Sequence, residues 1–201
     1  MYKRIPVFHV ANTVSLMGLF FSLWSIRSLF EGNTDFAIIL FVLSGLCDLF
    51  DGKFARLFKR DAFQQQMGEY IDSFVDMVSF VALPVIFLFH FVSGMTLPLV
   101  LAVFYAICGI HRLGYFHIIK EDDFIGVPLT YITLALTVTY TFFSLFSATG
   151  TALFRAAIVL LFILLPLGFV WNRPVRRPSG KMYLLFIGLA IFVLVVIGSR
   201  L

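Results

Sequence analysis

Four aspartates stand in segments of this chain that are otherwise apolar enough to cross a bilayer. They belong to two patterns, Asp48-x-x-Asp51-Gly52-x-x-Ala55-Arg56 and Gly68-x-x-x-Asp72-x-x-x-Asp76. An aspartate near the middle of a bilayer costs roughly 2.5–3.5 kcal/mol on insertion scales, so four uncompensated ones would cost on the order of 10 kcal/mol. The fold must therefore bring cations or other partners to these side chains.

Helical spacing places the acids of each pattern on one face. Residues three, four and seven positions apart share a helix face, so Asp48 and Asp51 lie on one stripe with two small residues, Gly52 and Ala55. A second stripe runs through Gly68, Asp72 and Asp76, each about one turn from the next. We expect the two stripes to face each other and to form a pocket with four carboxylates.

Metal ions are the simplest compensation for such a pocket. Four ionised carboxylates a few ångströms apart need cations close to them, and ligand sets made only of oxygen favour magnesium, manganese or calcium over zinc. Two divalent cations about 3.5–4 Å apart are the arrangement that clamps the attacking and leaving oxygens in phosphoryl transfer. Gly52 and Ala55 would leave room for a large ligand against the helix backbone.

Other uses of buried acids have to be weighed against this one. Acids in membrane helices also act as proton relays or sodium sites, or they pair with arginines such as Arg56 and Arg112. An ion or proton transporter would use the acids in that way, but the sequence shows no inverted repeat of interrupted helices. Transport also leaves Gly52, Ala55 and Arg56 without a role, so the whole pattern favours an enzyme.

Composition identifies an integral membrane protein. Of the 201 residues, 61% are hydrophobic and 13% are charged, whereas charged residues make up about a quarter of soluble domains. The net charge of +4 is explained by basic loops at the membrane surface, and nucleic-acid binding has little support.

Seven stretches approach the roughly 20 residues that a helix needs to cross hydrocarbon. They are residues 8–30, 35–57, 69–92, 96–117, 127–148, 152–171 and 182–199. Lys3 and Arg4 precede the first stretch, which lacks a clear cleavage site and is expected to be an uncleaved transmembrane helix. The sequence therefore predicts an all-α, polytopic bundle of six to seven transmembrane helices, with residues 1–201 as one domain.

Basic residues indicate the orientation of the bundle, because lysine and arginine collect on the cytoplasmic side. If seven spans alternate, Arg27, Arg155 and Arg200 lie on one side and the other basic residues, out of 15 in all, lie on the opposite side. We therefore expect a cytoplasmic N-terminus and an acidic site that faces the cytoplasm.

The two patterns resemble the signature of the CDP-alcohol phosphotransferases, D-x-x-D-G-x-x-A-R followed by G-x-x-x-D-x-x-x-D. All signature residues are present, and the resemblance extends over about residues 10–128. It implies an integral membrane enzyme that moves a phosphatidyl group from a CDP-activated lipid to an alcohol and releases CMP. It also implies two divalent cations, Mg²⁺ or Mn²⁺, and it allows a homodimer, which is common in this family.

The resemblance assigns roles to the signature residues. Asp48, Asp51 and Asp72 would be the principal metal ligands, and Asp76 would contribute to the metal site and accept the proton of the attacking alcohol. Gly52, Ala55, Arg56 and Gly68, together with Asp48, would bind the CDP-lipid, and Arg56 would contact the diphosphate or secure the nearby acids. The Ala11-Asn12-Thr13 stretch matches the family's P-N-x-x-T motif only in part.

One departure from the family concerns the spacer between the two patterns. Family members usually have about eight residues between the motif arginine and the second glycine, whereas residues 57–67 separate Arg56 from Gly68 here. The longer loop carries Lys59 and Arg60 and is expected to affect substrate entry rather than metal binding.

Two segments resemble the phosphatidylserine synthases within this family. Residues 67–84 resemble M-G-x-E-L-D-S-x-x-D-x-V-S-F-G-x-x-P, with Val81 in place of the glycine and Glu69 one place earlier than the motif's glutamate, and residues 106–113 resemble I-C-G-x-x-R-L. Serine is therefore the expected acceptor, and Arg112 is a candidate to hold its carboxylate or a phosphate of the donor. Glycerol phosphate, inositol phosphate, ethanolamine and choline stay open as acceptors, as does an ether-lipid donor.

Overall fold

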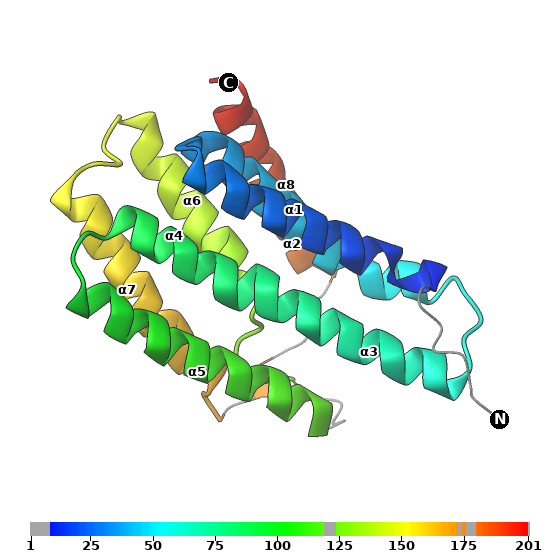
Figure 1. The fold of residues 1–201 in the computed structure, drawn as a ribbon. Helices are drawn as coiled ribbons and strands as arrows, with labels where there is room; N and C mark the ends of the chain where they lie inside the picture. The colour runs from blue at the N-terminus through cyan, green and yellow to red at the C-terminus, as the bar shows by residue number, and fades with distance from the viewer. Residues whose placement is uncertain (1–8, 119–123, 173, 176–179, 201) are drawn as a thin grey trace.

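The computed structural model describes residues 9–118, 124–172, 174–175 and 180–200, and helices make up most of them (Figure 1). The elements follow in the order η1 (Val10–Asn12), α1 (Thr13–Phe30), α2 (Thr34–Ala55), α3 (Ala62–Asp76), η2 (Met77–Ala82), α4 (Leu83–Phe91), α5 (Thr96–Ile118), β1 (Phe124–Ile125), α6 (Tyr131–Leu145), α7 (Ala152–Phe169), β2 (Pro174–Val175) and α8 (Gly180–Gly198). The α3, η2 and α4 segments run directly into one another as a single long rod. The predicted all-α bundle is confirmed.

Short turns separate the rods where turn-forming residues stand in the sequence. Gly32 and Gly94 have φ angles of 78° and 110°, a backbone conformation that glycine adopts without steric cost. The side chain of Asn33 accepts a hydrogen bond from the Phe36 amide at 3.2 Å and caps α2. Such caps satisfy amide groups that the first helical turn leaves unpaired.

Helix α1 packs against its neighbours through small residues rather than large ones. Ser15, Gly18, Ser22 and Ser25 are buried at helical spacing, whereas the large side chains of α1, such as Phe20, are exposed on the opposite side. Small residues let membrane helices approach closely, and hydroxyls then bond across the interface. Helices α1 and α2 accordingly pack against each other.

Ser22 ties three segments together. Its hydroxyl lies 2.7 Å from the Ser44 hydroxyl on α2 and donates to the Ser79 hydroxyl on η2 at 2.7 Å. The η2 segment is π-helical and follows Asp76 directly. On its other side, the buried Tyr105 hydroxyl of α5 donates to the Phe80 carbonyl at 2.6 Å. The widened turn is therefore held from both sides.

Aromatic side chains fill the centre of the bundle. The ring centroids of Phe41 and Phe87 lie 5.5 Å apart, and those of Tyr105 and Phe162 lie 4.9 Å apart. At the end of the bundle away from the acids, the Tyr140 hydroxyl donates to the Asp35 carboxylate. Helix α8 packs against α2 and α6 (Figure 1), so it covers one side of these two helices.

The third rod begins earlier than the sequence predicted. We expected it to start at residue 69, but α3 starts at Ala62, after a capping box in which Asp61 and Gln64 bond each other's backbone amides. Gln64 and the two glutamines after it are polar, so they lie outside an apolar window although they favour a helix. The fifth rod is shorter than residues 127–148, because the Pro128 region forms a turn before Tyr131.

The apolar rods support a polytopic membrane protein. Among the described residues, four helical runs are long and apolar enough to span a bilayer, namely Val10–Phe30, Ala62–Phe91, Thr96–Phe116 and Ala152–Phe169, and two shorter apolar helices accompany them. Helix α2 is long but carries Asp48, Asp51 and Lys53. Several basic residues used for the orientation lie outside the described residues, namely Lys3, Arg4, Lys120, Arg173, Arg176 and Arg177.

The close contact between α2 and α6 at Gly45 predicts that a larger side chain there destabilises the protein. A methyl group added at Gly45 would lie 2.8 Å from Cγ2 of Thr133, with the other Thr133 branch atoms within 3.3 Å, whereas one added at Gly188 on α8 would meet nothing within 4 Å. Alanine favours a helix over glycine at both positions. We therefore expect Gly45→Ala to lie about 1–3 kcal/mol below Gly188→Ala in stability, measured by thermal unfolding in detergent. Equal stabilities would contradict the close contact.

Candidate active site

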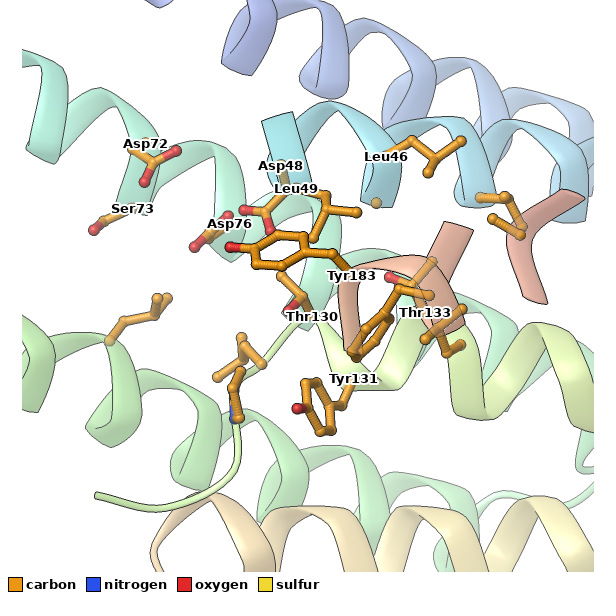
Figure 2. Close-up of a pocket in the computed structure, with 18 of the residues that line it drawn as sticks. Leu46, Asp48, Leu49, Asp72, Ser73, Asp76, Thr130, Tyr131, Thr133 and Tyr183 are labelled. Atoms are coloured by element: carbon orange, nitrogen blue, oxygen red, sulfur yellow. The ribbon is translucent and has the colours of Figure 1, made fainter. Parts of the chain in front are cut away.

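Three of the four aspartates come together where α2 and α3 face each other. One carboxylate oxygen from each of Asp48, Asp72 and Asp76 lies within 4.8 Å of the other two. Asp48 comes from the last turns of α2, and Asp72 and Asp76 come from the last turns of α3. Figure 2 shows these three side chains gathered at one end of a cavity. The helical spacing thus leads to the facing stripes expected from the sequence.

Asp51 has a different environment from the other three acids. It is 9% exposed, and its Oδ2 accepts a hydrogen bond of 2.8 Å from the Ser15 hydroxyl of α1. The carboxylate remains close enough to Asp72 and Asp48 to interact with them electrostatically. Ser15 therefore holds Asp51 at the edge of the acid cluster and offsets part of its desolvation cost.

The donor set fits divalent cations. Oδ1 of Asp72 is buried and has no hydrogen-bond partner among the described residues, although a buried carboxylate oxygen normally has one. The convergent carboxylate oxygens of Asp48, Asp72 and Asp76 are hard ligands that suit Mg²⁺ or Mn²⁺. These three residues, with Asp51 beside them, could hold such ions.

A cavity of about 420 Å³ opens beside the acids. Its charged wall contains Asp48, Asp72 and Asp76 together with two arginines, Arg56 and Arg112. Helix α6 and the turn before it contribute Thr130, Tyr131 and Thr133, and α8 contributes Tyr183 (Figure 2). The cavity therefore combines a charged wall with a wall of hydroxyl groups.

Arg112 reaches this cavity because the chain after α5 folds back onto α7. Gly126, with a φ of 78°, lies so close to the end of α7 that an added Cβ would be 2.6 Å from the Phe169 carbonyl oxygen. The next residue, Val127, accepts a bond of 3.3 Å from Nε of Arg112, which is 7% exposed. The antiparallel pairing of β1 with β2 joins the same two connecting segments.

The small residues of the signature have unlike surroundings. Gly52 is exposed, and a methyl group there would meet nothing within 4 Å, so the surface beside it is open. Neither Gly52 nor Ala55 lines the cavity. Gly68, by contrast, is buried, and an added Cβ would lie 2.9 Å from Arg60 and 3.1 Å from Asn12.

Several residues of the site were not found from the sequence. Ser15 lies three positions after Asn12, so the partial match at residues 11–13 marked the right helix end but not the residue that bonds Asp51. Thr130, Tyr131 and Thr133 follow the Pro128 turn and carry no motif that distinguishes them from packing residues. Tyr183, whose ring lies 4.2 Å from Nζ of Lys53, had no sequence signal.

The CDP-alcohol phosphatidyltransferase family model matches residues 8–196. Among curated proteins, the chain is 37% identical over 136 residues to the CDP-diacylglycerol–serine O-phosphatidyltransferase of Bacillus subtilis, a match that covers 64% of this chain and 74% of that protein. Proteins of the same name match from Saccharomyces cerevisiae, at 30% identity over 64% of this chain and 51% of the yeast protein, and from Mycobacterium leprae, at 28% over 58% and 41%.

The bond from Ser15 to Asp51 yields a prediction about metal binding. Partners that orient metal-binding carboxylates typically contribute about 10–100-fold to affinity, so we expect Ser15→Ala to weaken Mn²⁺ binding about 10-fold, measured by electron paramagnetic resonance titration of the purified protein. Ser28→Ala is the matched control, because Ser28 is also buried on α1 but bonds the Trp24 carbonyl of its own helix. An unchanged Mn²⁺ affinity in Ser15→Ala would show that the bond from Ser15 to Asp51 does not contribute to the metal site.

Proposed function

The chain belongs to the CDP-alcohol phosphatidyltransferase family, and from this premise we propose that it transfers the phosphatidyl group of CDP-diacylglycerol to the hydroxyl of L-serine. The observation that carries the proposal is the cluster of Asp48, Asp72 and Asp76 at the charged end of the cavity, with Arg56 and Arg112 on the same wall. The serine transferases among its relatives support the choice of acceptor.

The residues divide the work of the reaction between them. Asp48, Asp51, Asp72 and Asp76 would hold two divalent cations, Mg²⁺ or Mn²⁺, which when bound would neutralise the diphosphate and the departing CMP. Arg56 would contact the diphosphate through its planar guanidinium. Gly52 and Ala55 would let the cytidine nucleotide lie against α2, where the surface is open beside Gly52. Gly68 would allow the close approach of Asn12 and Arg60 at the edge of this site.

Asp76 is our candidate for the general base. It lines the cavity and lies next to Asp48 and Asp72, so an acceptor hydroxyl in the cavity could reach it. The serine oxygen would form a bond to the phosphatidyl phosphorus while its proton passes to the Asp76 carboxylate, and the phosphorus–oxygen bond to CMP would break. The products would be phosphatidylserine and CMP.

Arg112 is the candidate that selects the acceptor. The cationic side chains among the described cavity residues are Arg56 and Arg112. If Arg56 serves the diphosphate, Arg112 can pair with one carboxylate, as serine requires. An acceptor that itself carries a phosphate, such as glycerol phosphate or inositol phosphate, would call for further cations, whereas ethanolamine and choline have no anionic group for Arg112.

We also propose that residues 1–201 form one membrane domain with its active site facing the cytoplasm. The family match over residues 8–196 supports a single domain, and the excess of basic residues on one side supports the orientation. A soluble nucleotide product and soluble serine would then exchange with the cytoplasm while the lipid chains stay in the bilayer.

The acceptor can be tested by measuring CMP release. Purified protein supplied with CDP-diacylglycerol and Mn²⁺ or Mg²⁺ should release CMP when serine is added, and Asp51→Asn should abolish this release. Glycerol phosphate, inositol phosphate, ethanolamine and choline are tested in parallel. Release with one of these in place of serine would keep the reaction and refute serine as the acceptor.

The role of Asp76 calls for separate measurements of turnover and binding. Asp76→Asn should lose nearly all turnover, about 10²-fold or more as expected for loss of a general base, while it keeps most of its affinity for the CDP-lipid. Asp35→Asn is the control, because Asp35 accepts a bond from Tyr140 at the other end of the bundle. An equal loss of CDP-lipid affinity in Asp76→Asn would make Asp76 an obligatory metal ligand and not the base.

A further inference from the structure

Two hydroxyl groups on the α6 wall of the cavity are buried and have no hydrogen-bond partner in the described part of the chain. Oγ1 of Thr133 and Oη of Tyr131 have no hydrogen-bond partner among the described residues, and Thr133 is 3% exposed. Both residues line the cavity (Figure 2). A buried hydroxyl without a partner costs free energy that a bonded one does not, so these groups are suited to a ligand that supplies hydrogen-bond acceptors.

Packing holds both hydroxyls in place. The Thr133 side chain lies against Gly45 of α2, where an added Cβ would be 2.8 Å from its Cγ2, so the side chain has little room to rotate. The Tyr131 ring packs on Phe186 of α8, with the ring centroids 5.0 Å apart. Groups that are fixed before binding lose little conformational entropy when a ligand arrives.

The lining of the cavity changes in character along its length. Asp48, Asp72, Asp76 and the two arginines form its charged part, and its lining also includes apolar side chains, among them Val42, Leu134 and Ala190. Val42 precedes Asp48 by six residues on α2, which corresponds to about 9 Å along the helix toward the middle of the bundle. Thr133 and Tyr131 belong to the first turn of α6, and Thr133 lies against Gly45, which stands between Val42 and Asp48 on α2.

This order of charged, hydroxyl and apolar surfaces matches the order of groups in a diacyl lipid. In such a donor the diphosphate is followed by the glycerol, then by two ester carbonyls, and then by the hydrocarbon chains. With the diphosphate at the acids, the ester carbonyls come next along the molecule, before the chains reach apolar surroundings. A carbonyl oxygen accepts a hydrogen bond from a hydroxyl readily, whereas an ether linkage has no carbonyl.

We propose that Thr133 and Tyr131 form a subsite for the ester linkages of the lipid donor, and that this subsite makes the protein select diacyl over ether-linked donors. Each hydroxyl donates a hydrogen bond to an ester carbonyl. The proposal rests on the proposed use of a CDP-lipid and goes beyond it by naming the linkage that is recognised. It does not depend on which alcohol is the acceptor.

The experiment compares two donors that differ only in this linkage. CMP release is measured with CDP-diacylglycerol and with a CDP-dialkylglycerol of equal chain length, for the wild type, Thr133→Val and Tyr131→Phe. The wild type should prefer the ester donor. Each substitution should lower kcat/KM for the ester donor about three- to ten-fold, the usual effect of one hydrogen bond, and leave the value for the ether donor within about two-fold.

Thr141→Val is the matched control. Thr141 is fully buried on the same helix, and its Oγ1 also lacks a partner among the described residues, but it does not line the cavity. This substitution should leave the ratio between the two donors unchanged. A general effect of replacing a buried threonine on α6 would appear in Thr141→Val as well.

Three results would overturn the proposal, and the first two concern the donors. One is a wild type that uses both donors equally, and the other is a Thr133→Val variant that loses the same factor with both. A rise in the KM for the acceptor alone would instead assign Thr133 to the acceptor and equally refute the ester subsite.

Binding is measured in parallel, as the shift in unfolding temperature that each donor causes in the presence of Mn²⁺. A larger shift with the ester donor, lost in Thr133→Val, would support the subsite even if no acceptor gave turnover. An absence of turnover with every acceptor would count against the proposed function, but not against the ester subsite.

Discussion

The burial of carboxylates in an apolar bundle is the constraint on which the rest of this structure depends. Asp48, Asp72 and Asp76 converge within a few ångströms, and an unpaired charge at membrane depth is costly. Several features offset this cost. A serine hydroxyl donates a hydrogen bond to Asp51, two arginines line the same cavity wall, and the carboxylate oxygens are suited to binding divalent cations. The same desolvation that makes the acids costly would strengthen their hold on a metal ion and on a diphosphate.

The helices that carry the acids are fixed by contacts with other parts of the bundle. Helix α1 offers a face of small residues, so α2 can approach closely and Ser22 can bond both Ser44 and Ser79. Tyr105 bonds the Phe80 carbonyl from the opposite side. The helices that carry the acids are thus attached to two helices, α1 and α5, that contribute no acid to the cluster, which is the kind of support that a precise metal site needs.

Local patterns in the sequence were enough to predict the bundle and the acid cluster, because both depend on short-range periodicity. Apolar runs located the rods, and the spacing from Asp48 to Asp51 and from Asp72 to Asp76 located the two faces. The apolar run begins at residue 69 although α3 starts at Ala62, because the glutamines of its first turns are polar and the capping box at Asp61 lies outside any apolar window. The hydroxyl wall of Thr130, Tyr131, Thr133 and Tyr183 was missed because it is assembled from α6 and α8, far from the motif along the chain. No local signal distinguishes such residues from ordinary helix packing.

The π-helical segment Met77–Ala82 has a consequence for how one rod serves two surroundings. A π turn accommodates one more residue than an α turn, so the faces before and after it are out of step by about 100° relative to an unbroken helix. Before the segment, Asp72 and Asp76 point toward the cavity, and after it, Leu83 and Phe87 enter the core. The extra residue rotates the second half of this continuous helix relative to the first half. The face that carries the acids and the face that packs in the core can therefore point in different directions. Removing a single residue there would leave every side chain outside the segment in the sequence but turn one of the two faces away from its partners.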